Sequence, residues 1–100
     1  MSYYQLPRRL HLLAHRDARS VVTRFLDTRR EVLNWYAILP NTILIVSSAD
    51  AHALASLNQA GLPHSWFVIT ELDPRKTNGF MNKQVWDFIN NPYSSGRWEP

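Results

Sequence analysis

Residues 42–46 read TILIV and run directly into SSAD at residues 47–50, and this stretch decides the fold. Its branched apolar side chains predict a strand that is apolar on both faces. Ser47 and Asp50 resemble a capping box with Asp in place of Glu, which predicts a helix directly afterwards. One helical layer covers only one face of such a strand. We therefore expect either the C-terminal segment or a second copy of the chain to cover the other face.

The segments on either side of this stretch carry strand and helix periodicities. In chain order they predict a strand at 9–15, a helix at 17–28, strands at 32–39 and 42–46, a helix at 51–60, a strand at 65–72 and a short helix at 83–90. We expect Pro40 to turn the hairpin, Gly61 to end its helix as a left-handed cap and Asn82 to cap the last helix. The order β–α–β–β–α–β predicts a ferredoxin-like α+β fold, with a four-stranded antiparallel sheet, both main helices on one face and a C-terminal short helix.

The length of 100 residues predicts one domain, at 9–90, between an irregular arm at 1–8 and a flexible tail at 91–100. The absence of cysteine excludes disulfides and thiolate metal sites. The first residues lack the apolar core of a signal peptide, and the apolar runs fall far short of the ~20 residues that span a bilayer. We expect a soluble, cytoplasmic protein that does not enter a membrane.

The charge is concentrated at the beginning of the chain. Residues 1–31 carry seven arginines against three acidic side chains, whereas residues 32–100 carry four basic and five acidic ones. A basic third attracts nucleic acid or another polyanion. The candidate phosphate-binding residues surround the first predicted strand: Arg8, Arg9, Arg16 and Arg19.

Aromatic residues near these arginines complete the nucleic-acid interpretation. Guanidinium groups bind phosphate in a bidentate manner, and aromatic rings stack on bases. The candidate rings are Tyr3, Tyr4, Trp35 and Tyr36. The alternative interpretation is that the arginines only keep a small domain in solution, and that the aromatic residues of the strands form core or dimer interface.

The element order and several local patterns resemble a known group of proteins. The first predicted strand ends in LLAHRD at 12–17, and the chain closes with FVITE at 67–71, NGF at 78–80 and VWDFI at 85–89. Over residues 9–90 the chain resembles small dimeric ferredoxin-like proteins of prokaryotes. These include the CRISPR-adaptation dimer subunit and the antitoxin endoribonuclease that cuts a toxin's message. Many unrelated functions use this fold.

Asp17 follows the first predicted strand. In the adaptation-subunit family, an acid at this place can bind a metal across the dimer axis. The resemblance therefore implies that Asp17 is catalytic and binds a divalent metal, which lowers the pKa of a water for phosphodiester attack. Asp17 also stands where a helix cap is expected, and a cap alone accounts for it. No second carboxylate lies nearby in the sequence, so a metal site would take one from a symmetry mate.

His11 and His15 share one face of the first predicted strand. Alternate residues of a strand are ~7 Å apart, so these two side chains stand about twice that distance apart and do not ligate one ion. We interpret them as ordinary surface or interface histidines. The sequence contains no Gly-rich phosphate loop, nucleophile elbow or zinc-ligand spacing.

Apolar residues on both faces of the strand at 42–46 also predict a homodimer. The predicted interface residues are Trp35, Tyr36, Ile43 and Ile45. Two functions follow from these observations. The first is a small prokaryotic-type nucleic-acid-associated protein, with weak metal-dependent nuclease or defence and antitoxin-type activity. The second is a non-catalytic homodimeric module that binds a protein partner.

Overall fold

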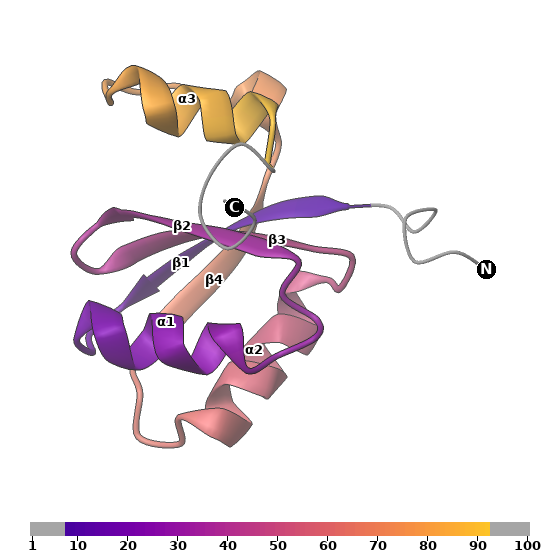
Figure 1. Ribbon diagram of the computed structural model, residues 1–100. Coiled ribbons are helices and arrows are strands. Elements are labelled where there is room, and N and C mark those ends of the chain that lie inside the picture. The colour runs from indigo at the N-terminus through magenta and orange to yellow at the C-terminus, as the bar shows by residue number, and fades with distance from the viewer. Residues whose placement is uncertain (1–7, 93–100) are drawn as a thin grey trace.

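The computed structural model describes residues 8–92 of the chain. The predicted arm and tail therefore lie outside the described residues, apart from Arg8 and residues 91–92. The elements are β1 (Arg9–His15), α1 (Arg19–Asp27), β2 (Asn34–Leu39), β3 (Thr42–Ser47), α2 (Ala51–Gly61), β4 (Phe67–Leu72), η2 (Pro74–Lys76) and α3 (Lys83–Asn90) (Figure 1). The predicted order is confirmed, with the short 3₁₀ helix η2 added in the loop before α3.

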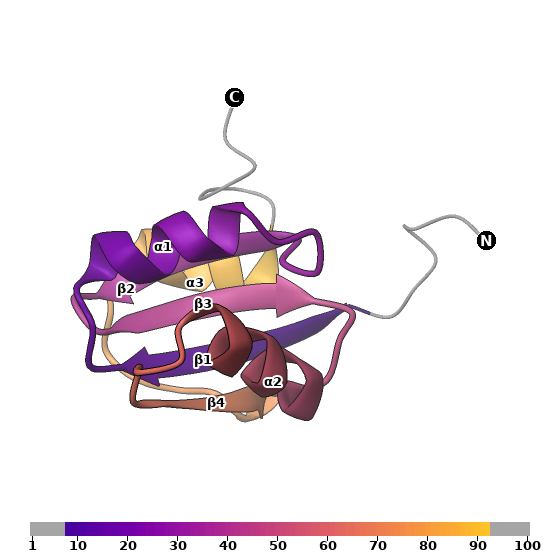
Figure 2. The same ribbon diagram turned by 90° about the horizontal axis from the view of Figure 1, so that it is seen from below.

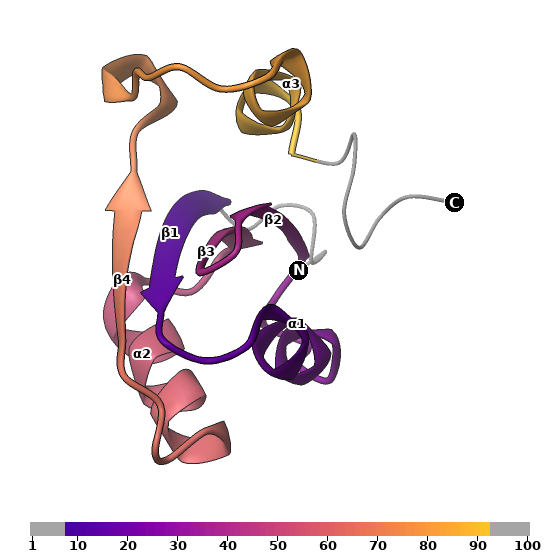
Figure 3. The same cartoon turned by 90° about the vertical axis from the view of Figure 1, so that its left-hand side faces the viewer.

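The four strands form one sheet in the order β2-β3-β1-β4, and all three neighbouring pairs are antiparallel. This is the sheet of a ferredoxin-like α+β fold. The two main helices lie on one face, with α1 on the β2 side and α2 on the β4 side (Figure 2). The helix α3 lies on the opposite face (Figures 1 and 3).

The interior strand β3 is buried on both faces, as its sequence predicts. Ile43 and Ile45 pack in the core under α1 and α2, which also contains Leu13, Val22, Leu26 and Leu54. Leu44 and Val46 pack in the core under α3, which also contains Leu10, Val85, Phe88 and Ile89. The C-terminal segment therefore covers the second face of β3 within one chain.

Two contacts fix the position of α3. Asn82 caps its first turn by accepting a hydrogen bond from the Val85 backbone N–H, as predicted. The Phe88 ring is fully buried and meets Tyr36 of β2 edge to face, with ring centroids 5.4 Å apart. Because α3 has only eight residues and packs beside β2, it leaves another part of this sheet face open. On that part, Trp66 and Val68 are 69% and 68% exposed.

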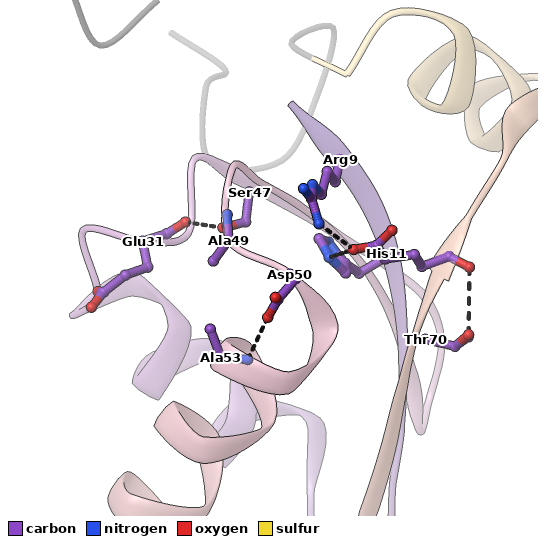
Figure 4. A network of polar contacts seen from close by, with 9 residues as sticks. Arg9, His11, Glu31, Ser47, Ala49, Asp50, Ala53 and Thr70 are labelled. Carbon is purple, nitrogen blue, oxygen red and sulfur yellow. Dashed lines mark hydrogen bonds and ion pairs between the residues drawn. The ribbon is translucent and has the colours of Figure 1, made fainter. Parts of the chain in front are cut away.

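The capping box predicted at Ser47 is wrong, although the helix begins where expected. Asp50 is the N-cap of α2, and its carboxylate accepts a hydrogen bond from the Ala53 N–H at 2.8 Å. Ser47 is instead fully buried, where its hydroxyl donates to the Glu31 carbonyl and accepts from the Ala49 N–H (Figure 4). The serine therefore joins the entry to α2 to the segment after α1.

The left-handed cap predicted at Gly61 is also wrong. Gly61 is the last residue of α2, and the residue after it, Leu62, has a negative φ of −130°. A Cβ atom at Gly61 would lie 2.0 Å from the ring of Phe25. The close approach of α1 and α2 therefore requires glycine at this position, because any side chain would clash with the Phe25 ring.

Candidate nucleic-acid interface

The four candidate arginines do not form one cluster. Arg8 and Arg9 stand at the start of β1, whereas Arg16 and Arg19 stand beyond its end. At ~3.3 Å per residue, the two pairs are roughly 20 Å apart. Arg9 is neutralised by Glu71 of β4, with an Nη1–Oε1 distance of 2.9 Å. Arg16 lies beside the open part of the sheet face, and Arg19 follows it at the start of α1. This second pair is the stronger candidate for contact with a polyanion.

Arg16 contacts Trp66 through both backbone and side chain. The Arg16 N–H donates to the Trp66 carbonyl at 3.1 Å, which continues the β1–β4 ladder by one step. The guanidinium carbon of Arg16 lies 4.2 Å from the centroid of the Trp66 ring, within the range of a cation–π interaction. Both side chains are exposed. A cation is therefore held over an aromatic ring at the protein surface.

Neighbouring residues turn this contact into a shallow hollow of about 620 Å³. We name it the Trp66 corner, and it is lined by Ala14, His15, Arg16, Asn41, Trp66, Phe67 and Val68. Ala14 and Val68 are direct partners in the β1–β4 register and provide an apolar floor. A second hollow, which contains Arg19, shares Asn41 with it. The corner thus combines an aromatic ring, an apolar floor and two nearby guanidinium groups.

Asp17 lies next to this corner but does not cap α1. The N-cap is Ala18, which makes no side-chain cap hydrogen bond, so the capping interpretation of Asp17 is wrong. The Asp17 carboxylate accepts a hydrogen bond from the Ser65 hydroxyl, and its backbone carbonyl accepts one from the Asn41 side chain at 3.0 Å. Asp17 therefore joins three loops around the Trp66 corner.

A metal site at Asp17 stays a prediction. Within residues 8–92, no group of three or more His, Asp or Glu side chains is placed to hold a metal ion. Asp17 would therefore need ligands from another chain, as the predicted site across a dimer axis requires. Its catalytic role is likewise untested.

The two histidines of β1 are buried, so their interpretation as surface or interface residues is wrong. His11 is fully buried and His15 is 7% exposed, because their shared face is the one that α1 and α2 cover. His11 Nε2 lies 3.9 Å from Glu71 Oε1, which is also the oxygen that pairs with Arg9. Burial lowers the pKa of His11, and it outweighs the Ile45 backbone and the Glu71 carboxylate, which favour the charged form.

The aromatic residues selected from the sequence are engaged within the chain. Trp35 is half-buried, and its indole N–H donates to Asp27 at 2.8 Å. Tyr36 packs on Phe88 under α3. Tyr3 and Tyr4 lie outside the described residues. The ring that the open sheet face presents is Trp66, which the sequence analysis did not propose for base stacking.

The predicted dimer interface finds no direct support in one chain. Ile43 and Ile45 are buried by α1 and α2, and their burial needs no second copy. Trp35 and Tyr36 are each half-buried, on opposite faces of the sheet. A role for these four residues between two chains stays a prediction.

Comparison with known proteins adds no relative. Neither a known family, nor a curated protein, nor a solved structure matches this chain. Among the helices of residues 8–92, none has the length and apolar character required to cross a membrane.

Proposed function

We propose that this protein associates with nucleic acid and contacts the phosphate backbone through Arg16 and Arg19 beside the Trp66 corner. The observation that carries the proposal is the guanidinium group of Arg16, held 4.2 Å above an exposed tryptophan ring. Within the described residues neither Arg16 nor Arg19 forms an ion pair, unlike Arg9. Asp17 lines the same hollow as Arg19, but its carboxylate accepts a hydrogen bond from the Ser65 hydroxyl and forms no ion pair with either arginine.

The stacked geometry of Arg16 suits phosphate binding. A guanidinium group that stacks on a ring uses its planar face, so its N–H donors at the edge stay available for an anion. Both arginines adjoin hollows that share Asn41, so one nucleic-acid strand that crosses these hollows meets both guanidinium groups. Such contacts give affinity that is independent of sequence and falls steeply with salt.

Binding to a labelled oligonucleotide at several salt concentrations tests this proposal. Replacing Arg16 or Arg19 with alanine should lower the slope of log affinity against log salt by about one each. Lys76→Ala is the matched control, because Lys76 is exposed, follows the far end of β4 and, unlike its neighbour Arg75, forms no ion pair within residues 8–92. A parent protein that shows no binding at low salt, or a control that weakens binding equally, would overturn the proposal.

Strand cleavage is the finer part of this proposal and takes a separate test. The resemblance to prokaryotic nucleases and antitoxin-type factors makes Asp17 the candidate ligand for a divalent metal. Asp17→Asn removes the anionic ligand but keeps an acceptor for the Ser65 hydroxyl. A metal-dependent nuclease should lose cleavage in this variant. Unchanged cleavage by a folded Asp17→Asn protein would remove Asp17 from the chemistry.

The second candidate function is a homodimeric interaction module, and the edge strand β4 supports it. The other edge strand, β2, is protected by a register shift between Ala37 and Leu39 and by the proline that follows it. In contrast, β4 carries a single charged side chain, Glu71, which is paired with Arg9 of β1, and it contains no proline. An edge strand with so little free charge is a template for pairing with another strand. Light scattering at tens of micromolar tests this candidate, since the module requires a mass of two chains, and a mass of one chain would exclude it.

A further inference from the structure

We infer that the nucleic acid at the Trp66 corner is single-stranded and that one unpaired base stacks on the Trp66 indole ring. This inference rests on the proposed function and specifies its ligand. The starting observation is the 69% exposure of Trp66, which is unusual for so large an apolar side chain at the end of a strand.

The Trp66 ring is presented in a defined orientation. Its backbone is hydrogen-bonded to Arg16 at the end of β1, and the Arg16 guanidinium group lies over the ring. Ala14 and Val68, beside it on the same sheet face, are both exposed and apolar. An exposed ring of fixed orientation beside an apolar floor is the arrangement that a flat, partly apolar base needs.

The same arrangement selects against a duplex. In a double helix each base is stacked between its neighbours, so its flat faces do not reach a protein ring. An unpaired base of a single strand offers such a face, and every base has one, so the contact tolerates any sequence. A phosphate beside the stacked base can reach Arg16, and another phosphate of the same strand can reach Arg19 in the adjoining hollow. Stacking therefore adds a preference for single strands to the salt-dependent backbone contacts.

Phe80 provides a matched control for stacking. It is the other exposed aromatic side chain of the described residues, at 101% exposure against 69% for Trp66. It lies in the loop between η2 and α3, which follows the opposite end of β4 from Trp66. Truncation of Phe80 therefore removes an exposed ring without touching the Trp66 corner.

The experiment measures fluorescence anisotropy of labelled oligo(dT), oligo(U) and a DNA duplex of equal length at low salt. The parent should bind the single strands more tightly than the duplex. Trp66→Ala should weaken single-strand binding by roughly 5- to 100-fold, as expected when a stacked base loses its ring. Trp66→Phe should lie between parent and alanine variant, and Phe80→Ala should match the parent. The oligo(dT) and oligo(U) arms distinguish DNA from RNA as the source of the strand.

The intrinsic fluorescence of Trp66 gives a second readout that does not depend on the alanine variant. Stacking of a base on the indole should quench part of the parent's emission during titration with oligo(dT), and Trp66→Phe should lack that part. If Trp66→Ala and Trp66→Phe bind single strands like the parent while Arg16→Ala weakens binding, the single-strand inference fails and the proposed function stands. If the parent binds neither single strand nor duplex, both fail together.

Discussion

The two ends of β1 begin from similar sequences but differ in what they offer to solvent. Each end carries a histidine and an arginine, His11 with Arg9 and His15 with Arg16. At the first end, Arg9 is paired with Glu71 next to the buried His11. At the second end, Arg16 lies over the exposed ring of Trp66.

The residue that faces each end from β4 makes this difference. Glu71 is the register partner of His11, so a carboxylate meets the arginine at the start of β1. At the other end the ladder continues to Trp66, and a ring takes the place of the carboxylate. Whether an arginine of this segment is neutralised or available thus depends on the residue that faces it, which stands fifty or more positions later in the chain. The predictions that follow test this difference between the ends.

The largest expected effect comes from the covered part of the sheet face. Phe88→Ala should lower the free energy of unfolding by about 3–5 kcal/mol, because it leaves a cavity and removes the edge-to-face contact with Tyr36. Urea denaturation followed by circular dichroism measures this change. A loss below about 1 kcal/mol would mean that α3 does not hold this face closed.

A second prediction concerns the pH dependence of stability and the first end of β1, where His11 is buried next to the Arg9–Glu71 ion pair. Burial holds the pKa of His11 below its ordinary value of about 6.5, so the unfolded chain binds this proton more readily than the folded one. The contribution of neutral His11 to the free energy of unfolding is therefore fully present above about pH 6.5, and it is lost as the pH falls from there toward the pKa of His11 in the folded protein. The slope from one proton reaches at most about 1.4 kcal/mol per pH unit.

Unfolding free energies between pH 5 and 8 check this sign. His11→Phe removes the titrating group and should flatten the dependence over the same interval. His64→Gln is the matched control, because His64 is exposed. Stability that rises on acidification in the parent, or an unchanged slope in His11→Phe, would contradict the assignment.

The sequence predicted much of this architecture because local periodicity determines faces. The two-sided apolar run at 42–46 required cover on both faces, and the stripe of Val85, Phe88 and Ile89 supplied it. Periodicity could not tell which face of β1 meets α1 and α2, so the burial of His11 and His15 was not foreseen. That choice depends on the packing of all strands together.

The site was harder to predict because it depends on contacts between distant segments. The four arginines are close in sequence, but the extended strand β1, which begins at Arg9 and ends just before Arg16, separates them into two pairs. Trp66 carried a usable signal, since the alternation from 66 to 72 places it on the face opposite Phe67 and Ile69. Its exposure could not be inferred, because it depends on how much of that face the short α3 covers.

A third prediction concerns the first end of β1, where Glu71 neutralises Arg9, and makes it resemble the second end, where no carboxylate of the described residues pairs with Arg16. Glu71→Gln removes the carboxylate that neutralises Arg9, and the ion pair is about half exposed, so stability should change by at most about 1 kcal/mol. Affinity for an oligonucleotide should rise a few-fold at low salt, and the salt slope should increase by up to about one. Adding Arg9→Ala to this variant should cancel the gain. An unchanged affinity in Glu71→Gln would mean that neutralisation does not separate the two ends.

The smallest expected effect on stability is at the second end of β1, where Arg16 lies over Trp66. Trp66→Ala should change the free energy of unfolding by only about 0.5 kcal/mol, because most of the ring already faces water and its contact with Arg16 is exposed. Paired with Phe88→Ala in the same urea series, it compares an aromatic truncation on the covered and uncovered parts of one sheet face. A loss of several kcal/mol in Trp66→Ala would show that the ring is a structural part of the fold. It would also contradict the inference that Trp66 is exposed in order to bind a base, because packing of the ring, within one chain or between two copies, would then explain why a tryptophan stands there.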